Sequence, residues 1–213
     1  MTILDNYHST KKIVDTLSIN TKIIAVTKRF SIEKINPLII EGHKDFGENK
    51  VQEAILKWKN ILKQHTDLNL HLLGHLQSNK VSEAVNIFNY IHSLDSEKLA
   101  NKFMIEENKV NKKLKYFIQI NIGEEQQKFG ISIKDTKSFI SFCKKEAKLQ
   151  IIGLMCIPPV NKEPSFYFSQ LKELALSNNL LHLSMGMTSD YVDAIRNGST
   201  YIRIGTGIFG ERL

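Results

Sequence analysis

Short apolar runs alternate with longer amphipathic segments along this chain. Eight of the runs have the length of buried strands, and five of them are rich in β-branched or aromatic residues. They cover residues 22–28, 44–47, 70–74, 90–94, 114–122, 150–157, 180–184 and 200–204. The segments with apolar residues at helical spacing cover residues 31–41, 48–64, 78–88, 96–107, 133–147, 163–178 and 188–197. A further helix is predicted at residues 3–17, before the first strand.

Strict alternation of strands and helices favours a parallel sheet of the α/β class. Eight units are the number that closes a TIM-type (β/α)8 barrel, and 213 residues are at the short end for that fold. An open, doubly wound sheet is the alternative, but it usually has fewer strands, and no Gly-x-Gly-x-x-Gly follows the first strand. Because no linker interrupts the pattern, we expect residues 1–213 to form one barrel domain with an extra N-terminal helix.

Composition argues against several classes of protein. Apolar residues make up 42% and charged residues 24%, which is ordinary for a globular chain. No run of about 18 apolar residues, the length of a membrane span, occurs. Residues 1–10 mix polar and apolar positions, unlike a signal peptide. Cys143 and Cys156 lack metal-ligand spacing, so a reduced, cytoplasmic protein is the simplest interpretation.

The formal net charge of +7 raises the hypothesis of nucleic-acid binding. The lysines, however, are scattered over predicted helices and loops, without interleaved aromatic residues or a known nucleic-acid motif. We therefore favour a solvated surface over a nucleic-acid groove. The same positive field would also attract phosphorylated small molecules.

The first apolar run ends in Lys28, shortly before the helix predicted at residues 31–41. This lysine thus lies at the carboxyl end of a strand, where parallel α/β proteins place their chemistry. Desolvation favours the neutral form of an amine held there, and a neutral amine can condense with an aldehyde. The pattern leaves a second interpretation open, because a charged lysine with a salt-bridge partner is also common at a strand end.

Glycines and hydroxyl side chains follow the last two strands. Residues 184–190 are SMGMTSD, and residues 203–207 are RIGTG. In TIM barrels the loops after strands seven and eight frequently bind phosphate, and glycines let backbone N–H groups approach it. A helix that starts near Thr188 or Ser189 would add its positive end. Either loop alone is better explained as a turn or a helix cap, but the two together predict a phosphate site.

Arg203 stands between Ile202 and Ile204 in the last strand. If the two isoleucines pack against the helices, alternation points Arg203 into the barrel. A buried arginine stays charged and needs an acceptor. That acceptor is either a carboxylate of the barrel, in a structural ion pair, or a ligand. Inward-facing acidic candidates are few, which makes a ligand credible.

Four further positions carry weaker signals. Asn49 follows the second strand, where it either lines the mouth of the barrel or starts a helix. His71 and His75 flank the third strand at a spacing too long for a metal pair, so a structural or mouth-lining role is favoured for His75. Met155, at the end of the sixth strand, packs against a flat ligand or fills the core.

Several of these motifs resemble the YggS/PROSC family of pyridoxal-phosphate homeostasis proteins. They are AVTK at 25–28, FGEN at 46–49, LGHLQSNK at 73–80, GLM at 153–155, SMGMTSD at 184–190 and IRIGTGIFG at 202–210. The similarity runs in order from about residue 23 to residue 212. It implies a barrel like the N-terminal domain of alanine racemase, which binds pyridoxal 5′-phosphate (PLP) in the fold-type III manner.

The resemblance also implies roles for individual residues. Lys28 matches the lysine that forms a Schiff base with PLP, and Arg203 matches the arginine that faces the pyridine nitrogen. Asn49 matches an asparagine of the pocket. The phosphate cradle matches four residues at the ends of the last two strands, namely Ser184, Gly186, Gly205 and Thr206.

Two lysine positions of the family deserve separate mention. Some relatives carry a second lysine two positions after the Schiff-base lysine, and this chain has Phe30 there. Any role of that second lysine in passing the cofactor along is therefore in doubt for this chain. Lys128 resembles another family lysine, near a secondary cofactor site.

The chemistry of these residues fits a carrier better than a catalyst. A pyridoxal enzyme uses the ring as an electron sink, which a carboxylate strengthens by keeping the ring nitrogen protonated. Arg203 cannot accept that proton. Racemisation also needs a second base, which alanine racemase-like enzymes take from an additional β domain of the partner chain. Since the sequence stops at Leu213, we expect that domain to be absent.

The resulting expectation is a non-enzymatic PLP-binding protein in vitamin B6 homeostasis. We expect a cytoplasmic monomer that does not bind nucleic acid, membrane or metal, with apo-PLP enzymes as recipients of the cofactor. One alternative is a PLP-dependent amino-acid racemase of low activity. The other is a barrel that uses its basic surface to bind nucleic acid or a protein partner.

Overall fold

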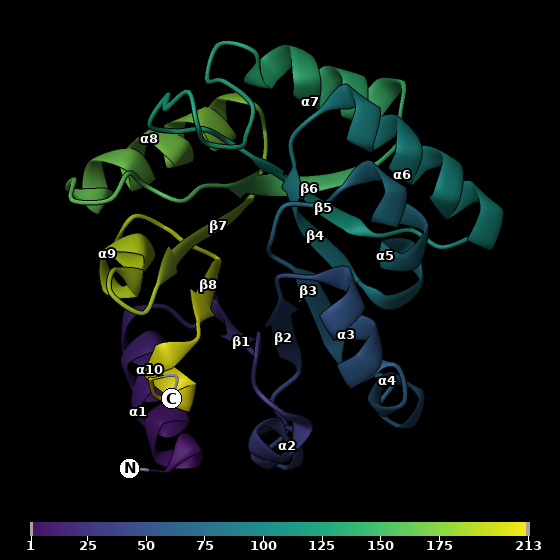
Figure 1. Ribbon diagram of the computed structural model, residues 1–213. Coiled ribbons are helices and arrows are strands. Elements are labelled where there is room, and N and C mark those ends of the chain that lie inside the picture. Colours follow the sequence, from purple (N-terminus) through teal and green to yellow (C-terminus); the bar gives the residue numbers. More distant parts are fainter. Residues whose placement is uncertain (1, 212–213) are drawn as a thin grey trace.

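The strands of the computed structural model close into one barrel (Figure 1). The structure describes residues 2–211, so Met1, Arg212 and Leu213 of the predicted span lie outside the described residues. The strands pair in parallel in chain order, and the first pairs with the last. They are β1 Lys22–Val26, β2 Asp45–Glu48, β3 Asn69–Leu72, β4 Tyr90–Leu94, β5 Lys115–Gln119, β6 Gln150–Met155, β7 His182–Met187 and β8 Tyr201–Ile204. The predicted TIM-type (β/α)8 fold is confirmed.

Helices surround the barrel on the outside (Figure 1). They are α1 Ile3–Leu17, α2 Ile32–Ile40, α3 Val51–Trp58, α4 Ile61–Gln64, the 3-10 helix η1 Ser78–Lys80, α5 Val81–Ile87, α6 Glu97–Val110, α7 Thr136–Lys145, α8 Pro164–Ser177, α9 Tyr191–Arg196 and α10 Thr206–Phe209. The extra helix α1 packs against α10, next to the place where β1 meets β8. Within residues 2–211, no helix combines the length and the apolar content needed to cross a membrane.

Strand alternation separates two apolar layers. The larger layer lies between strands and helices and includes Ile23, Ala25, Ile202 and Ile204. The smaller layer fills the barrel interior and comprises Ile24, Tyr90, Phe117, Met155 and Tyr201. Arg203 is buried in a strand whose flanking isoleucines pack on the helices, so its predicted inward direction is confirmed.

Several element boundaries differ from the prediction. β1 ends at Val26, because the chain leaves the strand path near Arg29, whose φ is 65°. The helix predicted at residues 48–64 is divided into α3 and α4 by a turn, and Asn60 precedes the second piece as its N-cap. The predicted strand 114–122 stops at Gln119.

The seventh strand is displaced toward the C-terminus relative to residues 180–184. Leu180 still closes the end of α8, since its backbone N–H donates to Ala175 O at 3.0 Å and Asn179 has a φ of 53°. β7 then runs on to Met187, and α9 begins only at Tyr191. Thr188 and Ser189 therefore form a turn between strand and helix, at the mouth of the barrel.

Candidate functional site

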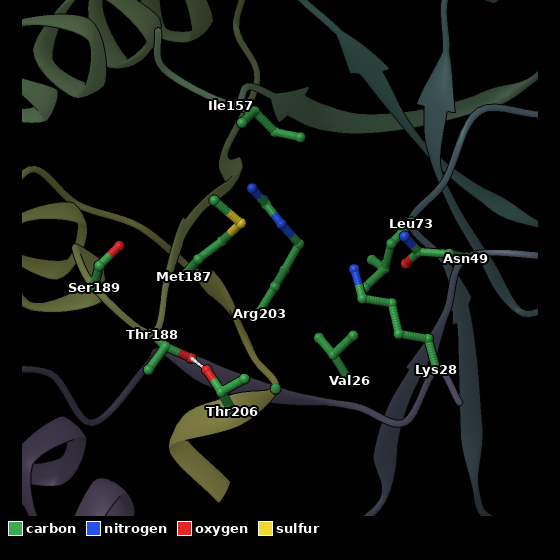
Figure 2. Close-up of a pocket in the computed structure, with 11 residues that line it drawn as sticks. Val26, Lys28, Asn49, Leu73, Ile157, Met187, Thr188, Ser189, Arg203 and Thr206 are labelled. Atoms are coloured by element: carbon green, nitrogen blue, oxygen red, sulfur yellow. Dashed lines mark hydrogen bonds between the residues drawn. The ribbon is translucent and has the colours of Figure 1, made fainter. Parts of the chain in front are cut away.

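A cavity of about 390 Å³ opens at the carboxyl ends of the strands. Its wall includes five of the predicted site residues, which are Lys28, Asn49, Arg203, Gly205 and Thr206. Figure 2 labels all of these except Gly205, together with Thr188 and Ser189 from the turn after β7. The carboxyl ends of parallel strands meet at one face of a barrel, which explains why residues so far apart in sequence share one wall.

Lys28 is positioned by its two chain neighbours. The Thr27 hydroxyl donates to Glu48 Oε1 at 2.6 Å, and the Thr27 carbonyl accepts from Lys57 Nζ at 2.7 Å. The backbone N–H of Arg29 donates to Glu53 Oε1. The backbone on both sides of Lys28 is thus held while its half-buried side chain extends toward the cavity (Figure 2).

We call Glu48, Glu53 and Lys57 the outer clamp, because they lie between β2 and α3, outside the barrel. Lys57 Nζ lies 2.8 Å from Glu48 Oε1 and 3.1 Å from Glu53 Oε1, and Trp58 Nε1 donates to Glu48 Oε1 at 2.9 Å. The Glu48 side chain is fully buried. This clamp was not predicted from the sequence, although Glu48 directly follows the strand predicted at residues 44–47 and a lysine stands nine positions later.

Arg203 is held from inside the barrel. Its Nη1 donates to Ser184 Oγ at 2.9 Å and its Nη2 donates to the Cys156 carbonyl at 3.0 Å. Burial lowers the pKa of the guanidinium, which still carries its charge at neutral pH. Among the described residues no carboxylate forms an ion pair with Arg203. The remaining N–H groups of the side chain are therefore available to an acceptor in the cavity.

The part of the wall formed by Thr188, Gly205 and Thr206 is suited to an anion. Thr206 Oγ1 lies 3.3 Å from Thr188 Oγ1, which accepts from the backbone N–H of Gly207 at 3.2 Å. Thr206 is the first residue of α10, so backbone N–H groups without helical partners point out of this end. A Cβ at Gly205 would lie 3.6 Å from Val26 Cβ, another wall residue, so a side chain there would project into the cavity.

Ser184 and Gly186 are not among the residues that line the cavity. The Ser184 hydroxyl is fully buried in the barrel interior, where it contacts His92 and Arg203. Gly186 has a φ of 93° and faces α9, since a Cβ there would come within 2.5 Å of Ala194 Cβ. The structure thus places both residues behind the wall and brings Thr188 and Ser189 forward in their place.

The weaker candidates are distributed around the site. Asn49 lines the cavity, and its carbonyl would lie 2.3 Å from a Cβ at residue 74, which only glycine avoids. His75 stacks on Phe129 at 3.8 Å and pairs with Asp95 at 3.3 Å. Met155 fills the interior layer.

Phe30 and Lys128 have packing partners of their own. Phe30 stacks on Phe209 of α10 with ring centroids 4.8 Å apart, so it joins the Lys28 loop to the helix that carries Thr206. Lys128 lies 2.6 Å from Glu125 Oε1, and its Nζ donates to the Pro158 carbonyl at 3.4 Å. The two cysteines are free and buried, and burial raises the pKa of each thiol to about 12.

Fold and sequence together define the class of this barrel. The family described as "Alanine racemase, N-terminal domain" matches residues 2–213. An alanine racemase of Clostridium difficile has the same fold, with a TM-score of 0.77 at 16% identity, and the match covers 98% of this chain and 57% of that one.

Closer relatives narrow the class to one family. The chain is 36% identical over 211 residues to the pyridoxal phosphate homeostasis protein of Synechocystis sp., which covers 95% of this chain and 96% of the relative. PipY of Synechococcus elongatus, solved with PLP bound, is 34% identical with a TM-score of 0.87 over 98% of this chain and all of that one. This chain belongs to the YggS/PROSC family of pyridoxal phosphate homeostasis proteins.

Proposed function

We propose that the chain binds PLP as a Schiff base on Lys28 and acts as a carrier, without catalysing a reaction. The observation that carries this proposal is the cavity wall, which combines an amine, a guanidinium and a group of hydroxyl and backbone N–H donors. The aldehyde, the ring nitrogen and the phosphate of PLP suit these three features. The PLP-bound structure of PipY supports the same ligand.

Each residue predicted from the sequence has a role in this proposal, and so does Thr188. Lys28 condenses with the aldehyde, Arg203 donates to the lone pair of the ring nitrogen, and Asn49 lines the pocket. Thr188, Thr206 and the backbone at Gly205 hold the phosphate. Ser184 contributes by holding Arg203 from behind, and Gly186 shapes the turn that presents Thr188.

The small number of ionisable side chains on the described wall favours a carrier over an enzyme. Apart from Lys28 and Arg203, no described residue on the wall has an ionisable side chain that could serve as a second base. Arg203 also keeps the ring nitrogen unprotonated, which weakens the ring as an electron sink. We further propose a role in intracellular PLP homeostasis, as a cytoplasmic monomer that passes PLP to apo-PLP enzymes, in line with the names of the relatives.

The lysine is tested by borohydride reduction of the PLP-loaded protein followed by peptide mass spectrometry. We expect the reduced cofactor on the peptide that contains Lys28, and Lys28→Ala should lose the visible absorption of the Schiff base. Lys12→Ala, at an exposed position of α1, is the matched control and should keep both signals. A wild-type protein that cannot be loaded with PLP would contradict the proposal.

The low-activity racemase is tested separately, by incubation of the loaded protein with L-amino acids in deuterated water. The carrier proposal predicts no sustained exchange of the α-hydrogen. Exchange over many turnovers, abolished by Lys28→Ala, would favour the enzyme instead.

A further inference from the structure

A linear series of hydrogen bonds crosses the barrel interior below the cavity. Asp45 Oδ1 lies 3.0 Å from His71 Nε2, and His71 Nδ1 lies 3.0 Å from His92 Nε2. His92 Nδ1 lies 2.8 Å from Ser184 Oγ, which accepts from Arg203 Nη1 at 2.9 Å. We call these five residues the interior network. It connects the cavity to Asp45, the first residue of β2, at the opposite end of the barrel.

The two ends of the interior network fix its direction. Arg203 can only donate hydrogen bonds, and the ionised carboxylate of Asp45 can only accept them. A neutral His71 therefore donates from Nε2 to Asp45 and accepts at Nδ1 from His92 Nε2. A neutral His92 then accepts at Nδ1 from the Ser184 hydroxyl, whose oxygen accepts from Arg203. Each donor meets one acceptor, and both imidazoles are neutral Nε2–H tautomers.

The charge states agree with this direction. Burial, together with neighbouring His71 and the charge of Arg203, lowers the pKa of His92 well below its ordinary value. Burial also lowers the pKa of His71, although Asp45 opposes the shift. For Asp45 burial alone would raise the pKa, but the hydrogen bond from His71 and the charge of nearby Lys22 outweigh it, so the pKa is lowered.

We propose that Asp45, His71 and His92 are positioning residues that hold Arg203, through Ser184, as a fixed donor toward the cavity. The network orients the guanidinium and stabilises its charge by aligned dipoles that end on a distant anion, without a carboxylate in contact. The cavity side of the guanidinium thus stays open for a ligand atom that accepts a hydrogen bond from Arg203. The ligand should therefore present an unprotonated ring nitrogen, whose lone pair accepts from Arg203. This requirement on the ligand rests on the proposed PLP function.

The network is tested first in the protein without cofactor, by long-range ¹⁵N–¹H NMR of the histidine rings at neutral pH. We expect His71 and His92 as Nε2–H tautomers. In Asp45→Asn the terminal amide can both accept and donate, so the direction is released and both rings should populate two tautomers. His8→Gln removes a surface histidine paired with Glu41 and should leave both signals unchanged.

The second readout is PLP affinity, measured by titration of the visible absorption. Asp45→Asn and His92→Phe each break the hydrogen-bonded connection between Arg203 and the Asp45 carboxylate. Each should weaken PLP binding by about fivefold to tenfold and shift the absorption maximum of the bound cofactor. An Nδ1–H tautomer in the wild type, or Asp45→Asn with unchanged tautomers and affinity, would overturn the proposal. A wild type that shows the tautomers but never binds PLP would refute the proposed function and leave the positioning of Arg203 intact.

Discussion

The two cations of the site are held from opposite sides of the sheet. Lys28 lies in a loop, and the outer clamp holds the backbone of its neighbours Thr27 and Arg29. Arg203 lies in a strand, and the interior network holds its guanidinium directly. The proposed chemistry explains the difference, because an amine that must form and break a covalent bond needs a mobile side chain on a fixed backbone. A permanent donor needs a fixed side chain.

The largest effect is expected from breaking the outer clamp with Glu48→Ala. This change leaves the buried Lys57 with only the partly exposed Glu53 as its ion-pair partner, and it removes the acceptor of Thr27 and Trp58. Loss of one partner of a buried ion pair typically costs about 3–5 kcal/mol. Urea unfolding should report a loss of that size, and Glu53→Gln, at the more exposed end of the clamp, should cost much less. A loss below about 1 kcal/mol for Glu48→Ala would show that the clamp does not hold the loop.

Acidification should weaken the interior network more than the outer clamp, because the outer clamp contains no histidine. The pKa values of the two histidines of the interior network, His71 and His92, are lowered mainly by burial, and burial likewise lowers the pKa of His43, which lies outside the network against Tyr7. Below the unfolded histidine pKa of about 6.5, the unfolded chain binds protons that the folded protein excludes.

The free energy of unfolding should therefore fall between pH 7 and pH 5, by up to about 1.4 kcal/mol per pH unit for each histidine. Urea unfolding at several pH values measures the slope, and His92→Phe should reduce it. A flat profile over this range would contradict the neutral state of the buried rings.

The smallest of the three effects is expected for Arg203→Lys. A single ammonium lacks the planar fork that reaches Ser184 and the Cys156 carbonyl at once. We expect PLP binding to weaken about tenfold, or about 1.4 kcal/mol, with little change in stability. Titration with PLP beside urea unfolding separates the two quantities. Unchanged affinity would mean that the direction of the guanidinium is irrelevant to the ligand.

Much of the site could be predicted from the sequence because it depends on strand periodicity. Lys28, Asn49, Arg203, Gly205 and Thr206 each follow or end a strand, and parallel strands bring such positions to one face. The inward direction of Arg203 followed from its two isoleucine neighbours. These inferences need only the period of a strand and the order of the units.

The interior network could not be predicted in this way. His71 and His92 lie in adjacent strands, and their contact depends on a register that aligns His71 with Tyr90. The position of Ser184 likewise depends on where β7 starts, which Asn179 shifts by its positive φ. Strand register and left-handed residues are set by tertiary packing, so a single sequence predicts them poorly.

The pairing of β1 with β8 has a consequence for folding. Ile23 aligns with Ile202, and the cavity wall is built from both sides of this seam, with Lys28 on one side and Arg203 and Thr206 on the other. Closure joins segments separated by most of the chain, so we expect it late in folding. A ligand that contacts both sides binds only the closed ring. At a concentration one hundred times its dissociation constant, it would stabilise that state by about 2.7 kcal/mol. Bound PLP would thus stabilise the β1–β8 pairing on which its own binding site depends.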